Sequence, residues 1–211
     1  MIEYWPTLKE IKEFKYMPNA YLEAQASKSH KTSVFNIEVP TIAGLFGLGA
    51  SAFGVTTVYF PGFDDFEIMD KTSKYGLAAA HWGEQRAIEA GIELMGYFVG
   101  EVTKFETPVD LSFMTPFQQD VLGALITVPY GETVSYAELA AMAGHAGKNV
   151  AVGSCLKHNP APVIVPCHRV ISASGAIGGW SGPKGTKEEL LKLEKTTSVK
   201  SKSTVLRLVN T

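Results

Sequence analysis

The chain has 211 residues, of which 45% are apolar and 19% are charged, and its net charge is -2. This length and composition suit one large domain or two small ones, and the near-neutral charge argues against a uniformly basic nucleic-acid binder. The charge is uneven, because residues 1–107 hold 9 Lys and Arg against 14 Asp and Glu (-5), whereas residues 108–211 hold 10 against 7 (+3). A polyanionic partner would therefore meet the second half.

The sequence lacks the features of an exported or membrane-bound protein. No stretch of about 18 uncharged apolar residues occurs, and residues 1–6 do not form a basic region followed by an apolar core. The chain has two cysteines, Cys155 and Cys167, which are too few for a disulfide framework at this size. We therefore expect a cytoplasmic protein with no membrane partner.

The first half predicts a small sheet covered by a helix. Residues 1–40 show no clear period and are left unassigned, as an N-terminal extension. Residues 42–48 and 53–60 are apolar runs punctuated by glycines, which predicts two paired antiparallel strands. In residues 77–98 apolar side chains recur at helical spacing, which predicts a helix packed on the sheet. Residues 107–110 then resemble a linker into a second, mainly helical half.

The second half predicts three helices in close succession. Thr115 precedes a proline and an apolar helical pattern, so it caps the first helix, and Ser135 caps a shorter one that ends at Gly144. The next helix runs from about Asn149 to His158. The last two form a helix-turn-helix pattern, which is a weak signal alone because many helical hairpins bind no nucleic acid.

The last of these helices is rich in small side chains. Gly153 costs about 1 kcal/mol of helix propensity relative to alanine, so it serves close packing or close approach. The composition fits ordinary helix packing and a helix lying against a nucleic-acid groove equally well. The small residues are Ala151, Gly153, Ser154 and Cys155.

A thiol stands beside an imidazole in the run 166–170, Pro-Cys-His-Arg-Val. It follows the apolar residues 163–165, where we expect a buried strand to end. Only a few per cent of a cysteine is ionised near neutrality, so a cysteine nucleophile needs a base or a positive charge beside it. Cys167 and His168 fit that pattern, although the pair taken alone also fits a core cysteine beside a surface histidine.

Several motifs follow one another in a specific order: Thr115–Gln119, Pro129–Tyr136, Asn159-Pro160, Pro166–Val170, Gly178–Trp180 and Lys187–Glu194. With these motifs the chain resembles the O6-alkylguanine-DNA alkyltransferases from about Tyr97 to Glu194. The resemblance implies an α+β fold. Residues 1–107 would form a ribonuclease-H-like antiparallel sheet with a helix, 108–196 a winged-helix (helix-turn-helix) alkyltransferase domain, and 197–211 a basic tail.

The resemblance also implies an activity, that of a single-turnover methylated-DNA–protein-cysteine S-methyltransferase. The alkyl group of O6-alkylguanine, and also of O4-alkylthymine, in double-stranded DNA would pass irreversibly to Cys167 after the base is flipped out of the duplex. The protein would act as a monomer without a cofactor, associated with the nucleoid in a prokaryote.

By the same resemblance, His168 is oriented by Glu194 and takes the thiol proton through a bound water, while Tyr136 donates to the guanine ring. Arg169 is expected to be buried and paired rather than catalytic. Asn159 supports the site by hydrogen bonding, and the backbone at Cys167 and Val170 contacts the base. The expected substrate-binding residues are Asn159, Pro162, Val170, Trp180 and Ser181.

DNA contacts are expected from the small-residue helix. Members of the family insert an arginine in the pattern Arg-Ala-Val-Gly, and this chain has valine at that position, Val150. A valine can wedge into the minor groove but cannot hydrogen-bond the orphaned base, so we expect weaker duplex binding than in an arginine-bearing relative. The expected DNA-binding residues are Lys148, Asn149, Val150, Ala151, Gly153 and Ser154.

No metal site is expected, because no cysteine precedes residue 155 and His30 and His81 have no ligand partner at helical spacing. Lys184 and Lys187 are expected to add phosphate contacts, and the tail is either solvated or a further phosphate contact. Two other functions remain open. An alkyltransferase-like lesion-binding protein would lack the cysteine, and a Cys-His-Glu thiol hydrolase would not require the helix-turn-helix lead.

Overall fold

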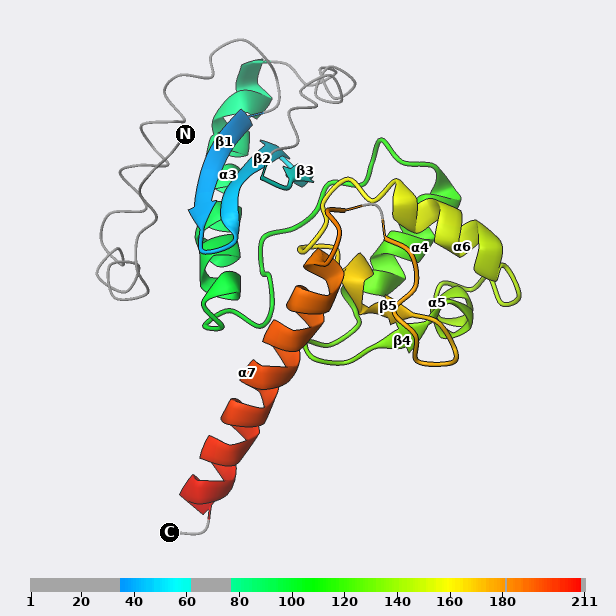
Figure 1. Cartoon of the computed structure of the whole chain (residues 1–211). Coiled ribbons are helices and arrows are strands. Elements are labelled where there is room, and N and C mark those ends of the chain that lie inside the picture. Colours follow the sequence, from blue (N-terminus) through cyan, green and yellow to red (C-terminus); the bar gives the residue numbers. More distant parts are fainter. Residues whose placement is uncertain (1–34, 62–76, 181, 210–211) are drawn as a thin grey trace. The chain divides into compact units, whose positions relative to one another are not determined.

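In a computed structural model of the chain, residues 35–61, 77–180 and 182–209 are described (Figure 1). The chain divides into two compact units, Met1–Phe113 and Met114–Thr211. The domain limits after residues 107 and 196 stay predictions, because compactness does not measure independent folding.

The first unit contains an antiparallel sheet in the order β1 (Phe35–Thr41), β2 (Gly44–Ser51), β3 (Gly54–Tyr59). The β2–β3 pair confirms the two strands expected from the sequence. Strand β1 falls largely in the segment left unassigned, and it pairs with β2 along its whole length. Ile37 and Val39 of β1 are buried while the residue between them is exposed, so one face of the sheet is covered.

Helix α3 (Leu77–Phe98) has the predicted bounds and packs mainly on β1 and β2 (Figure 1). Leu94 and Tyr97 are completely buried, and the ring centroids of Phe46 and Phe98 lie 5.0 Å apart. Each such side chain contributes about 1.5–3 kcal/mol by leaving water. The helix-on-sheet core that the sequence predicts is therefore confirmed.

The segment that follows α3 is held against the edge of β3 rather than forming a free linker. The amide of Val55 donates to Pro108 O and the amide of Asp110 donates to Val55 O, both at 2.8 Å. Asp110 is buried and accepts a hydrogen bond from Ser51 Oγ at 2.6 Å. Gly54 has φ +148°, and a Cβ there would collide with the Pro108 carbonyl, so only glycine permits this approach.

The second unit begins with the predicted capped helices. Helix α4 (Pro116–Ile126) starts after Thr115 and helix α5 (Tyr136–Met142) after Ser135, each with a reciprocal capping box. An N-cap of this kind is worth about 1 kcal/mol. Gly144 has φ +77°, a left-handed conformation that ends α5 as expected.

Helix α6 (Asn149–Lys157) follows after a connection of a few residues and ends one residue earlier than predicted. Helices α4, α5 and α6 contact one another, with Leu122, Leu139 and Val152 completely buried among them. The hairpin of α5 and α6 is thus braced by α4, which leaves the outer side of α6 open.

The apolar run Val163–Val165 is not the strand that we expected. Val163 has φ +77°, and the run forms a turn in which Pro162 bridges to Val165, although all three apolar side chains are buried. Prolines at 160, 162 and 166 lack amide donors, which is why this run cannot join a ladder. An apolar pattern predicts burial here but not conformation.

The turn leads into a short 3₁₀ helix, η3 (Cys167–Arg169), and strand β5 (Val170–Ile171), which pairs in parallel with β4 (Val134–Ser135). Helix α7 (Thr186–Val209) packs on η3 and buries Glu194. The helix continues beyond residue 196, where we expected the tail to begin.

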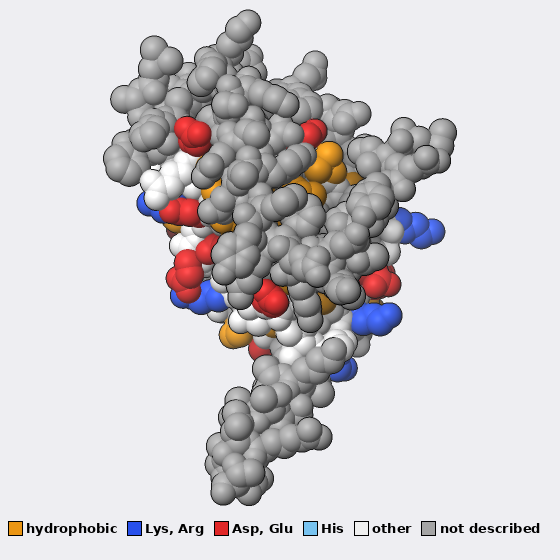
Figure 2. All heavy atoms as spheres, turned by 90° about the vertical axis from the view of Figure 1, so that its left-hand side faces the viewer, with side chains coloured by type: hydrophobic (Ala, Val, Ile, Leu, Met, Phe, Trp, Pro, Cys, Tyr) orange, Lys and Arg blue, Asp and Glu red, His pale blue; other side chains and the backbone are white. Residues whose placement is uncertain are grey.

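The face shown in Figure 2 carries charged side chains of both signs, and neither sign forms a continuous patch on the described residues. No helix in the described part of the chain combines the length and the apolar character needed to cross a membrane.

Candidate active site

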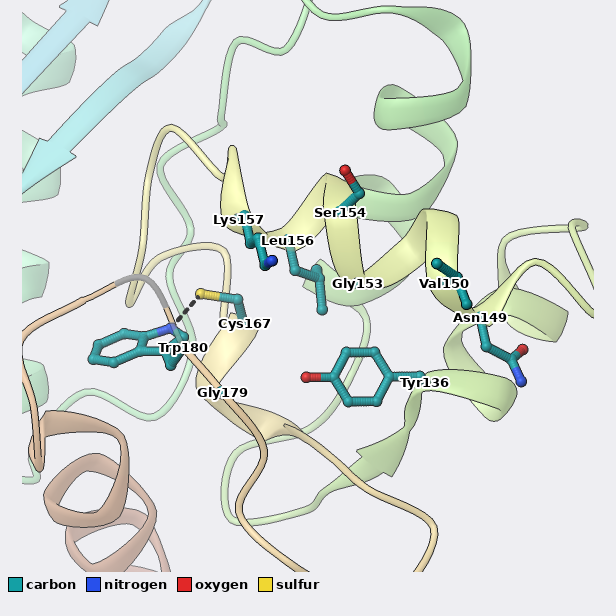
Figure 3. A pocket seen from close by; sticks show the side chains of 10 residues that line it. All are labelled: Tyr136, Asn149, Val150, Gly153, Ser154, Leu156, Lys157, Cys167, Gly179 and Trp180. Carbon is teal, nitrogen blue, oxygen red and sulfur yellow. Dashed lines mark hydrogen bonds between the residues drawn. The ribbon is translucent and has the colours of Figure 1, made fainter.

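The thiol of Cys167 lies at the wall of a pocket of about 600 Å³ in the second unit. Cys167 starts η3, is 3% exposed and is not in a disulfide. Its sulfur accepts a hydrogen bond from the indole nitrogen of Trp180 at 3.0 Å (Figure 3). The pocket is lined by Tyr136, Asn149, Val150, Gly153, Ser154, Leu156, Lys157, Cys167, Gly179 and Trp180.

The surroundings of Cys167 work in opposite directions on its acidity. Burial raises the pKa of the Cys167 thiol, whereas hydrogen bonds from Trp180 and Asn159 and the positive charge of Lys187 lower it. For Cys155, burial raises the pKa to about 11. Cys167 is therefore the thiol with polar partners, and its net upward shift means that a base must remove the proton.

His168 is positioned to be that base. The ring is completely buried, and Nε2 lies 2.7 Å from Glu194 Oε1. Because a carboxylate only accepts, Nε2 carries the proton and Nδ1 carries the lone pair. Burial lowers the pKa of His168, and the positive charges of Arg169 and Lys187 lower it further. The hydrogen bond to Glu194 and its negative charge act in the opposite direction and raise it. The imidazole is therefore neutral near pH 7 and can accept a proton.

Glu194 is the centre of a buried cluster of hydrogen bonds. Besides His168, it accepts from Nε of Arg169 at 3.0 and 3.1 Å, from Nη2 at 2.9 Å and from the amide of Gly131 at 2.9 Å. Burial alone would raise the pKa of Glu194, but the hydrogen bonds from His168 and Arg169 lower it to about 2. Arg169 also donates to Val128 O at 2.6 Å, so the expectation that it is buried and paired is confirmed.

The side of the pocket opposite Trp180 is formed by α5 and α6 (Figure 3). The hydroxyl of Tyr136 is a donor at neutral pH, because burial and the neighbouring Cys167 raise the pKa of Tyr136. A Cβ added at Gly153 would meet the Tyr136 ring at 3.6 Å, and one at Gly178 would meet its hydroxyl at 3.3 Å. Gly178 thus allows the loop to approach this tyrosine closely, whereas a side chain at position 153 would make an ordinary contact with the ring.

The outer face of α6 carries the residues predicted to bind DNA. Lys148, Asn149, Ala151 and Ser154 are exposed, Gly153 is half-buried, and Val150 is 91% exposed. Lys148 also places its ammonium 5.9 Å from the centre of the Phe117 ring. Lys157 is a further exposed residue of the pocket that was not predicted, although it lies seven positions after Val150 and hence on the same helical face.

Three other predicted substrate-binding residues, Asn159, Pro162 and Val170, do not line the pocket. Asn159 donates to Val165 O at 2.8 Å and accepts from Ala161 N at 3.1 Å, which braces the turn before Cys167. Val170 is completely buried and Pro162 is half-buried, and neither lines the pocket. Ser181 lies outside the described residues.

Lys187 is not the phosphate contact that we expected. It is 2% exposed, and its Nζ donates to Val170 O at 2.7 Å. Burial lowers the pKa of Lys187, and its charge acts on Cys167 instead. A lysine in an otherwise polar stretch gives no sequence signal of such burial. Lys184, by contrast, is exposed.

Among the described residues, no group of three or more His, Cys, Asp and Glu side chains is placed to hold a metal ion. His30 lies outside those residues, as does the side chain of His81.

Comparison with known proteins assigns this chain to a family. The methylated-DNA–protein-cysteine methyltransferase of Mycobacterium bovis is 46% identical over 124 residues, which are 58% of this chain and 74% of that protein. The chain belongs to the methylated-DNA–protein-cysteine methyltransferase family. The family model described as 6-O-methylguanine DNA methyltransferase, DNA binding domain, matches residues 116–196 of this methyltransferase.

Solved structures of the family agree with this assignment. Mycobacterium tuberculosis O6-methylguanine methyltransferase superposes with a TM-score of 0.63 at 36% identity, covering 78% of this chain and 94% of that one. Mycobacterium tuberculosis OGT in complex with DNA superposes with a TM-score of 0.60 at 37% identity, covering 77% and 92%. The methyltransferase described here therefore shares the mixed α/β architecture of these proteins.

Proposed function

We propose that this protein repairs DNA by moving the alkyl group of O6-alkylguanine, and of O4-alkylthymine, directly and irreversibly to Cys167. The observation that carries the proposal is the pocket in which Cys167 faces the recognition helix α6, with His168 and Glu194 behind it. Double-stranded DNA is the partner, as the DNA complex of the solved relative suggests. The protein acts as a monomer in the cytoplasm, where chromosomal DNA is accessible.

The reaction is a displacement at the alkyl carbon. Neutral His168 takes the thiol proton through a water molecule, and Glu194 stabilises the imidazolium that forms. The thiolate attacks the alkyl carbon, the bond from that carbon to guanine O6 breaks, and guanine leaves with the electron pair. Tyr136 protonates the guanine ring, and solvent later returns a proton to Tyr136 and takes one from His168. Cys167 remains a thioether, so each molecule acts once.

The base reaches Cys167 by leaving the duplex, which costs a few kcal/mol and least for a damaged pair. We assign this step to a winged-helix part that follows a ribonuclease-H-like sheet, with α6 in the minor groove. Lys148, Asn149, Ala151, Gly153 and Ser154 follow the backbone, and Val150 fills the gap. Trp180 and Ser181 hold the base, while Asn159, Pro162 and Val170 support the backbone around Cys167.

The test is to incubate the protein with a duplex containing O6-methylguanine and to analyse it by intact-mass and peptide mass spectrometry. We expect one methyl group per molecule, on the peptide that holds Cys167. Cys167→Ala should abolish the product, whereas Cys155→Ala should keep it. Binding without modification would replace this proposal with a lesion-binding protein, and turnover of an ester or amide would replace it with a thiol hydrolase.

A further inference from the structure

Trp180 is assigned above to the substrate base, yet its indole nitrogen points at the nucleophile. Nε1 lies 3.0 Å from Cys167 Sγ (Figure 3). An indole N–H only donates, so the sulfur is the acceptor. Hydrogen bonds that end on an ionised group are stronger than those between neutral groups, so this contact favours the thiolate over the thiol.

We propose that Trp180 is a catalytic residue of this site: its indole N–H holds the Cys167 sulfur as a thiolate before transfer and releases it when the sulfur becomes a thioether. The inference deepens the proposed alkyl transfer and rests on it for the identity of the natural alkyl donor. The contact itself concerns the thiol, so it can be tested with any electrophile.

The loop around Trp180 is built to hold the indole in this position. A Cβ added at Gly182 would lie 2.5 to 2.8 Å from three atoms of the Trp180 ring, so any larger residue there must displace the indole. Trp180 and Gly182 also line a second cavity of about 240 Å³, together with Pro183 and Lys184. The indole is therefore in close contact with Gly182 and has open space beside it.

Alkyl transfer weakens the hydrogen bond between Trp180 and the sulfur. The sulfur gains a bond to the alkyl carbon, guanine leaves with the electron pair of the broken C–O bond, and the negative charge on sulfur disappears. A neutral thioether is a weak acceptor. The environment of the Trp180 indole should therefore change once per molecule, at the moment of alkylation.

A thiolate held by a hydrogen bond is more abundant near neutrality but less nucleophilic, because nucleophilicity falls with the pKa of the thiol. Removal of the N–H should therefore slow alkylation near pH 7 and leave the rate at high pH equal or faster. A side chain that only shapes the pocket would lower the rate at every pH.

The experiment is the alkylation of Cys167 by iodoacetamide, followed by peptide mass spectrometry from about pH 6 to about pH 11, a range that extends well above the ordinary thiol pKa because the pKa of Cys167 is raised. Trp180→Phe keeps a ring and removes the donor. We expect a rate about three- to tenfold lower at pH 7, a midpoint at higher pH and no loss at the high-pH plateau. Gly182→Ala retains every atom of Trp180 but displaces it, so its profile should shift in the same direction even if Trp180→Phe folds poorly.

Gly123→Ala is the control, because a Cβ there meets nothing within 4 Å and the profile should match the wild type. The chain has three tryptophans, so fluorescence of Trp180 is read in a Trp5→Phe, Trp82→Phe background and should change until one equivalent of Cys167 is alkylated. Unshifted profiles for folded Trp180→Phe and Gly182→Ala would overturn the inference. A shifted profile without methyl transfer from DNA would retain it and overturn the proposed function instead.

Discussion

Replacing Glu194 by glutamine should remove a large part of the stability of the second unit. The side chain is completely buried, and its carboxylate accepts hydrogen bonds from His168, Arg169 and Gly131. These interactions lower its pKa from the ordinary 4.5 to about 2, and one pKa unit corresponds to about 1.36 kcal/mol. The carboxylate form therefore contributes about 3 kcal/mol to the free energy of unfolding.

The sign of the pH dependence follows from the downward shift. A carboxyl group with a lower pKa in the folded state stabilises that state fully above pH 4.5, and the contribution is lost as the pH falls toward about 2. Glu194→Gln lacks the contribution at every pH. The variant should thus be about 3 kcal/mol less stable than the wild type at pH 7, and the difference should shrink at pH 3.

Urea unfolding followed by circular dichroism at several pH values measures this difference, and the remaining carboxylates cancel because both proteins contain them. Glu189→Gln is a matched control, since Glu189 is exposed on the same helix and its loss should cost less than about 1 kcal/mol. A difference below about 1 kcal/mol for Glu194→Gln at pH 7, or one that stays constant down to pH 3, would refute the assignment of Glu194 as a charged, paired group.

Three further changes test the outer face of α6 and the surroundings of the thiol. Val150→Arg should tighten duplex binding about three- to tenfold and steepen its salt dependence by about one counterion. Fluorescence anisotropy at two salt concentrations measures both effects. Unchanged affinity would show that Val150 does not enter the DNA. Lys187→Met removes a buried positive charge, so the pKa of Cys167 should rise and iodoacetamide should react about three- to tenfold more slowly at pH 7. An unshifted pH profile would contradict that account. Asn159→Ala removes one of two hydrogen bonds to Val165 O and the acceptor of the Ala161 amide, so it should cost about 1–3 kcal/mol in urea unfolding. A loss below about 0.5 kcal/mol would count against the bracing role.

The sequence predicted best the elements whose ends have a local chemical signal. Thr115 and Ser135 cap α4 and α5 as expected, because their side chains bond to amides only three residues away. Helix α3 was predicted equally well, since its apolar spacing extends over many turns. Strand β1 was not predicted, because its own residues show no clear period and its conformation depends on pairing with β2.

In the site, the motif predicted the nucleophile and its base but not the groups that tune them. Trp180 lies on a loop that brings its indole to Cys167, and Lys187 is buried where it donates to Val170 O of β5. No local sequence pattern predicts either contact. The turn at Val163 was missed for a related reason. Apolar composition indicates what leaves water, while the prolines around it decide which conformation the backbone adopts.

The parallel pairing of β4 with β5 fixes the position of Cys167 within the second unit independently of the outer side of α6. Val134 pairs with Val170, so the backbone just before α5 is tied to the backbone just after the nucleophile. The position of Cys167 relative to the start of the helical hairpin therefore depends on main-chain hydrogen bonds and not on the identity of surface side chains. Residues on the outside of α6, Val150 above all, are consequently free to change in size and charge while the sulfur of Cys167 keeps its place.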